Sequence, residues 1–227
     1  MSADTFDFLS DPVVRDFVFL GEAGCGKSEL AVNLALSLSR EGKKVSFFDL
    51  DMTKPLFRSR DLSDALEKEG VDVFYEEQFA DAPTTGGWLE VEIAKKDRYC
   101  ILDVGGDYMG ARAVGGYSGL LTRPEAQVFY VINPYRPWSD SIEHIDGVLS
   151  QVLTSARLSV ADVKFLANPY LGSSTTRRSI EDGYHKLVSV IGEYTTISAL
   201  MVPEEMMDDV DLPVPLVPVQ KKIVYPW

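Results

Sequence analysis

The sequence has few cysteines, no long apolar run and no leader-like start, and each absence excludes a class of protein. Its two cysteines, Cys25 and Cys100, belong to no CxxC or Cys/His cluster, which excludes a disulfide framework and a zinc site. No apolar run approaches the ~18 residues of a membrane span, and the acidic N-terminus lacks a basic-then-apolar leader. We therefore expect a soluble, cytoplasmic protein without stable membrane association.

Positive charge is also scarce. Lys and Arg total 22 against 35 Asp and Glu, which gives a formal net charge of −13 at pH 7. A chain this acidic is repelled by nucleic acid unless it carries a basic patch, and the sequence shows none. The 45% hydrophobic and 25% charged residues are typical of a globular protein. The length suits a single domain that spans residues 1–227.

Short apolar runs alternate with helix-like stretches along the chain. Each run is nearly continuous in apolar residues, which is typical of a parallel sheet covered on both faces. The sequence thus predicts an α/β fold: a doubly wound, mostly parallel sheet with helices on both faces. We expect strands at 17–20, 45–50, 73–75, 99–104, 128–132, 163–167 and 196–202, and helices at 28–40, 62–69, 139–154 and 176–191.

Two segments depart from this alternation. Residues 78–87 are rich in small and turn-forming residues, which indicates a loop. The tail from about residue 211 contains Pro213, Pro215, Pro218 and Pro226, which forbid a helix and favour extended chain. Two interpretations stay open for this Pro-rich tail: packing along the surface of the domain, or docking of a partner.

A phosphate-binding loop is the strongest signal. Residues 21–28 (GEAGCGKS) satisfy G-x-x-x-x-G-K-[ST] and lie directly between an apolar strand and an amphipathic helix. Backbone N–H groups of such a loop converge on phosphate oxygens, helped by the helix dipole. The alternative is a strand–turn–helix without a ligand. The predicted nucleotide-binding residues are Gly21, Glu22, Ala23, Gly24, Cys25, Gly26, Lys27 and Ser28.

Three of these side chains have specific expectations. Lys27 would bridge the β- and γ-phosphates and contribute to catalysis, and the Ser28 hydroxyl would bind Mg²⁺. A thiol at a helix N-terminus has a lowered pKa, so redox control through Cys25 is one interpretation. A small side chain that the loop tolerates is the simpler one.

The second constellation is the segment 101–106 (ILDVGG), an apolar strand that ends in an acid and two glycines. We expect Asp103 to contact Mg²⁺ directly or through water, as a metal-binding and catalytic residue. Gly106 would offer its N–H to the γ-phosphate. The alternative role for an aspartate at a strand end is a helix cap.

The third constellation is Asp49 and Asp51, two carboxylates two positions apart at the end of a strand, which therefore point the same way. Ligands of open α/β sheets collect beyond the carboxyl ends of the strands, where the phosphate loop also lies. We expect Asp51 to position or activate water and Asp49 to join the metal shell or brace the loop. Turn and cap roles are the alternative.

Together these motifs resemble the MinD/ParA and CobQ/CobB type of P-loop nucleotide-binding protein, the SIMIBI class, over residues 17–203. The resemblance implies the three-layer α/β/α fold of P-loop NTPases, ATP and Mg²⁺ as ligands, and the family's catalytic aspartate position for Asp51. It also implies contacts with the nucleotide base for Asn168 and for the backbone near Pro203. Residues 49–61 and 103–112 look like an ATP-binding subfamily.

One departure from the family concerns partners. MinD, ParA and the nitrogenase iron protein carry a lysine after the first glycine of the loop, which reaches the phosphates of a dimer partner. Glu22 stands here instead, and a carboxylate cannot supply that contact. Our hypothesis is that Arg112 or Lys54 substitutes, with Arg58 and Arg60 as further candidates. A homodimer therefore stays open.

The resulting functional prediction is a Mg²⁺-dependent ATP-binding protein and ATPase, slow without its partner, that acts as a nucleotide-controlled switch on an unidentified protein. GTP is less favoured because residues 168–171 match the guanine motif N-K-x-D poorly. The family resemblance suggests cofactor or metalloenzyme maturation. The alternative is a small-molecule kinase or ATP-dependent ligase, whose acceptor pocket residues 78–87 or 134–138 would line.

Overall fold

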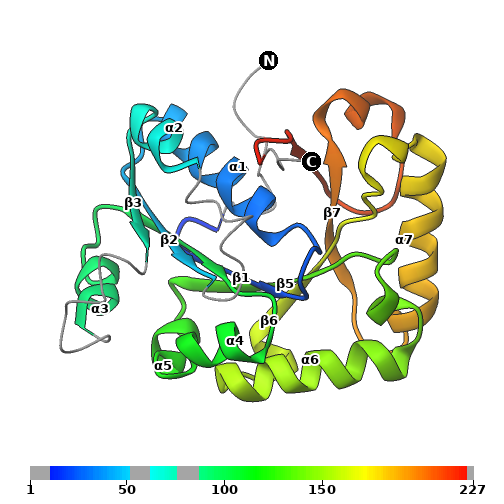
Figure 1. The fold of residues 1–227 in the computed structure, drawn as a ribbon, viewed down its shortest axis with the longest axis horizontal. Coiled ribbons are helices and arrows are strands. Elements are labelled where there is room, and N and C mark those ends of the chain that lie inside the picture. The colour runs from blue at the N-terminus through cyan, green and yellow to red at the C-terminus, as the bar shows by residue number, and fades with distance from the viewer. Residues whose placement is uncertain (1–10, 52–61, 76–86, 224–227) are drawn as a thin grey trace.

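The computed structural model of the chain describes residues 11–51, 62–75 and 87–223. The strands of this part form one 8-stranded sheet in the order β3-β2-β4-β1-β5-β6-β7-β8 (Figure 1). Every pair of neighbours in it is parallel. The strands are β1 Asp16–Gly21, β2 Val45–Leu50, β3 Val71–Tyr75, β4 Tyr99–Val104, β5 Ala126–Ile132, β6 Val163–Ala167, β7 Ile197–Pro203 and β8 Leu216–Val219.

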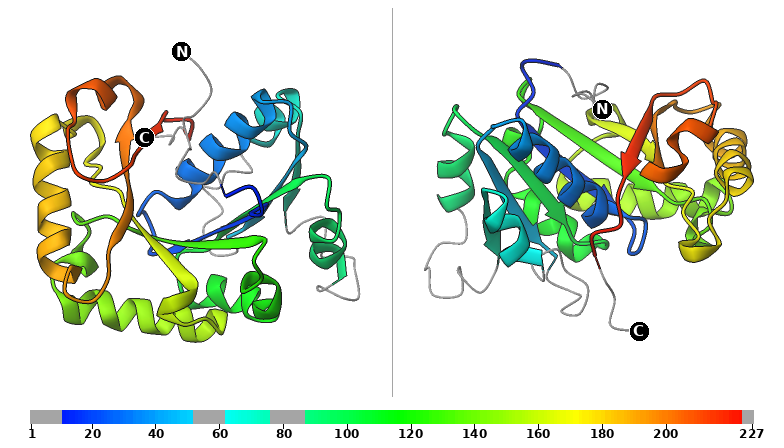
Figure 2. Two further views of the ribbon diagram at one scale, coloured as in Figure 1. Left: turned by 180° about the vertical axis from the view of Figure 1, so that it is seen from behind. Right: turned by 90° about the horizontal axis from the view of Figure 1, so that it is seen from above.

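Helices cover both faces of the sheet, as predicted. Figures 1 and 2 show α1 and α2 on one face, with α4, α5 and α6 across the sheet from them. Each face has its own apolar cluster: Leu30 and Leu34 of α1 belong to one, and Val114 of α4 and Leu149 of α6 to the other. The helices are α1 Lys27–Arg40, α2 Ser63–Lys68, α3 Gly87–Ile93, α4 Tyr108–Gly115, α5 Ser118–Leu121, α6 Ile142–Ala156 and α7 Arg177–Ile191.

Short 3-10 turns complete the connections of the described chain: η4 Pro137–Ser139, η5 Val160–Asp162, η6 Gly172–Ser174 and η7 Glu204–Asp209. No helix within the described ranges has the length and apolar character needed to cross a membrane. The predicted loop at residues 78–87 lies outside the described residues except for its last position, which begins α3.

The strand order places the functional motifs together. The order reverses at β1, which lies between β4 and β5, so the ends of β1 and β4 meet at the centre of the sheet. Phe19 of β1 pairs with Asp103 of β4, and Asp103 in turn pairs with Asp49 of β2. In an open α/β sheet the crevice beyond such carboxyl ends is where ligands bind.

The strand β8 and the helices α3, α4 and α5 escaped the sequence patterns. The expected positions of the first seven strands agree with the structure to within two residues, whereas β8 forms inside the Pro-rich tail. Pro218 is tolerated there because β8 is the edge strand of the sheet that the described residues form. The glycine-rich α4 has too few large apolar side chains for a clear helical period, and the Asp107 side chain caps it by accepting from Gly110 N at 2.8 Å.

Candidate nucleotide site

The loop between β1 and α1 has the backbone that its glycines permit. Gly26 caps α1 with a left-handed φ of 101°. A Cβ at Gly26 would lie 2.1 Å from Nδ2 of Asn168, which donates a hydrogen bond to the Cys25 carbonyl at 2.7 Å. Only glycine fits both the conformation and the space. The side chain of Asn168, which follows β6, therefore stabilises the loop by packing against Gly26 and bonding to the Cys25 carbonyl.

Lys27 folds back over the loop that precedes it. Its Nζ donates to the Glu22 carbonyl at 2.7 Å, and the residue is only 5% exposed. The ammonium is close enough to Asp103 to lower the pKa of that carboxyl. Lys27 thus places a buried positive charge at the centre of the loop, where a phosphate group would lie.

Three carboxylates meet beside this lysine. Asp49 and Asp103 are register neighbours on β2 and β4, and both are buried. Asp51 follows, with its backbone N–H donating to Oδ1 of Asp49 at 3.1 Å. Burial and the charge of Asp49 raise the pKa of Asp103 to about 7, although a hydrogen bond from Ser28 and the charge of Lys27 act in the opposite direction. The site is therefore rich in negative charge that a divalent cation would relieve.

These residues fit Mg²⁺. The Ser28 hydroxyl is close enough to the Asp103 side chain to lower the pKa of that carboxyl, so a hydroxyl and carboxylates already converge. Such oxygen groups are the ligands that Mg²⁺ prefers, and the ion usually takes only one or two from the protein and the rest from phosphates and water. Accordingly, no group of three or more His, Cys, Asp or Glu that could hold a metal ion alone occurs in the described ranges.

The segment after β4 lies directly against the phosphate loop. A Cβ at Gly106 would lie 2.5 Å from Ala23 N, so only glycine permits this approach. A Cβ at Gly105 would lie 3.2 Å from Oδ1 of Asp51, which places that carboxylate beside the same segment. The predicted residues Asp51, Asp103 and Gly106 are thus brought to the open end of the loop.

A cavity of about 170 Å³ opens on the other side of the loop. Asn168 and Pro203, the two predicted base contacts, both line it, together with Gly24 and Gly26. The arrangement lets a nucleotide place its phosphates on the loop and its base in the cavity. The remaining lining residues are Glu29, Asn133, Arg136, Tyr170, Met201, Val202, Glu205, Val219 and Lys221.

Arg136 is a site residue that the sequence patterns did not single out. Its Nε donates to the Gly24 carbonyl at 3.0 Å, and a Cβ at Gly24 would lie 3.4 Å from the guanidinium carbon. The residue follows β5, in the segment 134–138 that we considered as a pocket wall. Its place after a central strand, at the carboxyl end of the sheet, was the signal that could have identified it.

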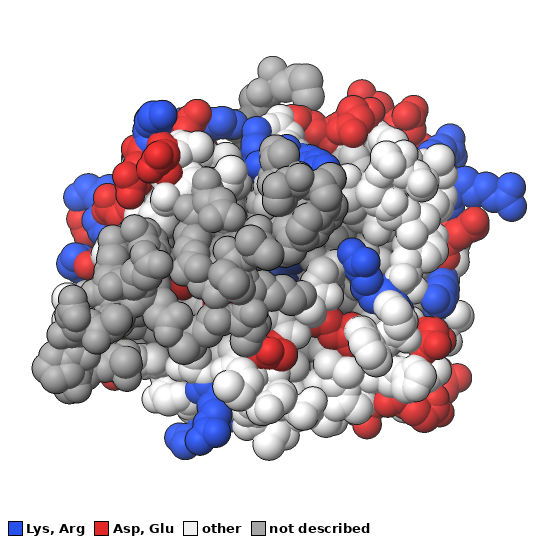
Figure 3. Space-filling model, viewed as in Figure 1, with Lys and Arg blue, Asp and Glu red and all other residues white. Residues whose placement is uncertain are grey.

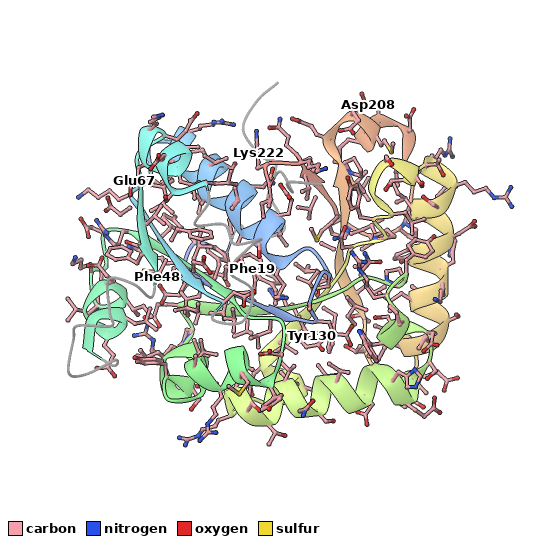
Figure 4. The ribbon with its side chains drawn as sticks, viewed as in Figure 1. Phe19, Phe48, Glu67, Tyr130, Asp208 and Lys222 are labelled. Atoms are coloured by element: carbon pink, nitrogen blue, oxygen red, sulfur yellow. The ribbon has the colours of Figure 1, made fainter. Side chains whose placement is uncertain are left out.

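Two loop side chains turn inward. Glu22 is 8% exposed and lies near Tyr130 of β5, which Figure 4 shows beneath the loop. Burial is the main cause that raises the pKa of the Tyr130 hydroxyl, and the charge of Glu22 adds to it. Cys25 is also buried, and burial raises the pKa of its thiol. The expectation of a lowered thiol pKa at the helix N-terminus is wrong, because desolvation outweighs the nearby Lys27 charge. Cys25 is a small buried side chain.

The proposed substitute cations are not tested by these contacts. Arg112 lies on α4 and is exposed. Lys54, Arg58 and Arg60 lie outside the described residues. One acidic group is visible in Figure 3, where red side chains at the upper right cover η7, the turn that carries Asp208 in Figure 4.

The comparisons with known proteins agree with this site. A model of the CobQ/CobB/MinD/ParA nucleotide binding domain family matches residues 17–202. The match covers most of the chain, and the protein belongs to this family. It has the fold of P-loop NTPases of the SIMIBI class. No curated protein sequence gives a significant match.

Solved structures of the same class share the fold. Signal recognition particle 54 kDa protein from Aeropyrum pernix K1, in complex with GDP, has a TM-score of 0.54 at 17% identity, over 83% of this chain and 42% of that one. FlhF complexed with GTP and Mg²⁺ has a TM-score of 0.52 at 15% identity, over 84% of this chain and 66% of that one. The signal recognition particle receptor FtsY from Elizabethkingia anophelis has a TM-score of 0.52 at 17% identity, over 92% of this chain and 65% of that one. The chain thus covers less than two thirds of each of these proteins.

Proposed function

We propose that the protein is a Mg²⁺-dependent ATPase that works as a nucleotide-controlled switch. The observation that carries the proposal is the geometry at the loop: Lys27 is buried over it, the Ser28 hydroxyl lies beside Asp103, and Gly106 lies against Ala23. These are the parts that a P-loop NTPase uses to hold phosphates and metal. ATP is the nucleotide we propose, and GTP is the alternative that the same site would accept.

Each residue has a defined role in this proposal. Lys27 neutralises charge on the β- and γ-phosphates, and the N–H of Gly106 donates to the γ-phosphate. Ser28, Asp49 and Asp103 would hold Mg²⁺, which when bound neutralises phosphate charge. Asp51 orients the attacking water and accepts its proton.

The position of the segment after β4 supports the switch that we propose. This segment contacts the loop at Ala23 and continues directly into α4, the helix on which Tyr108 and Met109 are exposed. Gain or loss of a γ-phosphate at Gly106 would shift α4 and change the surface offered to a partner protein. Maturation of a cofactor or metalloenzyme is one setting in which such a switch would act.

The test is phosphate release by the purified protein with Mg-ATP and with Mg-GTP. We expect slow turnover of ATP that Lys27→Ala abolishes, because the loop then lacks its central cation. Lys43→Ala, which removes an exposed lysine beyond the end of α1, is the matched control and should keep wild-type turnover. Turnover that survives in Lys27→Ala would contradict the proposal. Release that needs an added small acceptor would instead support the kinase or ligase alternative.

A further inference from the structure

The C-terminal segment 216–223, called here the strap, runs beside the phosphate-loop helix. Its first part is β8, which pairs with β7 so that Val202 faces Pro218 and Pro203 faces Val219. Figure 2 shows the strap, in red, lying along the blue α1 in the view from above. A segment distant in sequence from the loop thus becomes its neighbour in space.

Four backbone contacts fix the strap to the first turns of α1. Asn33 accepts from Gln220 N at 2.9 Å and donates to the Gln220 carbonyl at 2.8 Å. The Glu29 carboxylate accepts from the backbone N–H groups of Lys222 and Ile223. Side chains that satisfy backbone groups in this way hold a segment in one register. Glu29 lies two residues after Lys27, so the anchor and the phosphate site share one helical turn.

The strap also forms one wall of the base-side cavity. Val219 and Lys221 line it from the strap, and Asn168 and Pro203 line it from the ends of β6 and β7. The anchors explain why Lys221 is held at the cavity, since the backbone is fixed on both sides of it, at Gln220 and at Lys222. The wall therefore presents an apolar side chain and an ammonium group at defined positions.

We propose that two residues of the strap belong to the nucleotide site, with Val219 packing against the purine base and Lys221 donating a hydrogen bond to the base or ribose. This inference rests on the proposed function, because it assigns the base end of the same nucleotide. The phosphates bind at the loop, away from the strap wall. Removing Lys221 should therefore weaken binding of a complete nucleotide and leave binding of a ligand without a base unchanged.

The experiment compares Lys221→Ala with Lys222→Ala by calorimetry. Lys222 is the matched control because it is adjacent and carries the same charge, whereas its contact with Glu29 is made by backbone that the substitution keeps. The probes are Mg-ATP, Mg-GTP and Mg-tripolyphosphate, the last of which has no base or ribose. We expect Lys221→Ala to weaken the better-bound nucleotide roughly three- to tenfold and tripolyphosphate not at all. Lys222→Ala should match wild type with every probe.

Each other outcome has a definite meaning. Equal losses for nucleotide and tripolyphosphate would make Lys221 a phosphate contact and overturn the base-wall assignment. Wild-type affinity in Lys221→Ala would overturn it as well. If nucleotide binding by the wild type does not depend on Lys27, the proposed function itself fails, and the strap assignment fails with it.

Hydrogen exchange of the strap amides gives a second, independent measurement on the unaltered protein. We expect the better-bound nucleotide to slow exchange at Gln220, Lys222 and Ile223 more than tripolyphosphate does, because only the nucleotide contacts the strap. Equal protection by the two ligands would mean that the strap responds through α1 alone, and would overturn the proposal.

Discussion

The two ends of the sheet both bury charged side chains, but they balance that charge differently. At the amino ends of the strands, Asp16 pairs with Arg123 at 2.9 Å and Glu92 pairs with Arg98 at 3.0 Å. At the carboxyl ends, Asp103 and Asp49 lie side by side, and burial and mutual repulsion raise the pKa of Asp103 to about 7. The paired charges at the amino ends have a structural role, whereas the neighbouring carboxylates at the carboxyl ends indicate a site for a cation.

This comparison predicts opposite effects of mutation at the two ends. Removing one partner of a buried ion pair should reduce the stability of the protein. Removing a carboxylate that binds a ligand should reduce activity, and it should increase the stability of the protein without ligand. The following predictions test the contrast from the largest expected effect to the smallest.

The largest effect is expected at the amino ends. Arg98→Met removes the buried one of the two cations that pair with Glu92, along with contacts to Asp72 and to the Ser46 hydroxyl, and it keeps the pair with the more exposed Lys95. We expect a loss of about 3 kcal/mol in the free energy of unfolding, since a buried carboxylate that loses its buried partner is costly. Urea denaturation measures the loss, while nucleotide affinity should be unchanged.

The control for Arg98 is an exposed pair of the same chemistry. Arg40→Met breaks the ion pair with Glu69, in which both side chains are largely exposed, and should cost less than about 1 kcal/mol. The double variant Arg98→Met with Glu92→Leu should recover most of the stability, because it removes both charges. Equal costs for Arg98→Met and Arg40→Met would contradict the distinction between buried and surface charge.

At the carboxyl ends we expect the reverse. Asp103→Asn should lower ATP hydrolysis by on the order of a hundredfold, because a metal ligand is lost. Without nucleotide at pH 8, the same variant should be more stable by about 2 kcal/mol, since it removes a buried charge but keeps a polar group for Ser28. Thermal and urea unfolding check the gain, and a variant that is both inactive and less stable would refute the assignment.

The third prediction concerns pH. Burial raises the pKa of Asp16 from 3.8 to about 6, although Arg123 acts in the opposite direction. The native state therefore holds this proton more tightly, so the contribution is complete below the unfolded pKa and is lost as pH rises through about 6. Relative to Asp16→Asn, the wild type should lose on the order of 1 to 2 kcal/mol between pH 5 and pH 8. Urea denaturation across this range measures it, and parallel profiles would contradict the prediction.

The sequence predicts this fold well because its strongest signals are local. Continuous apolar runs mark the buried parallel strands, and GEAGCGKS carries its own turn and helix start. It predicts β8 poorly because prolines hide an edge strand whose pairing depends on β7, and α4 because its glycines weaken the helical period.

The site residues also divide into those that local motifs predict and those that only the fold brings together. Lys27, Ser28, Asp49 and Asp103 could be predicted, since each stands in a motif whose position along a strand fixes where it points. Arg136 could not, because its contact with Gly24 joins positions 112 residues apart and no local pattern encodes it. The strap wall is equally non-local, which is why the sequence left the role of the tail open.

Arg136 gives the last and smallest of these tests. At the amino ends Arg98 and Arg123 meet carboxylates, whereas the Arg136 Nε donates to the neutral carbonyl of Gly24 at the mouth of the loop. A guanidinium in this place suits a phosphate anion, and Arg136 is exposed in the structure, so the expected gain is modest.

Arg136→Ala should weaken Mg-ATP and Mg-tripolyphosphate alike by roughly three- to tenfold, about 1 kcal/mol. Arg178→Ala, on the exposed side of α7, is the control and should change neither affinity. Binding measured by calorimetry at two salt concentrations adds a second criterion, because a partly exposed phosphate contact weakens with ionic strength. A loss confined to ATP would assign Arg136 to the base instead of the phosphates.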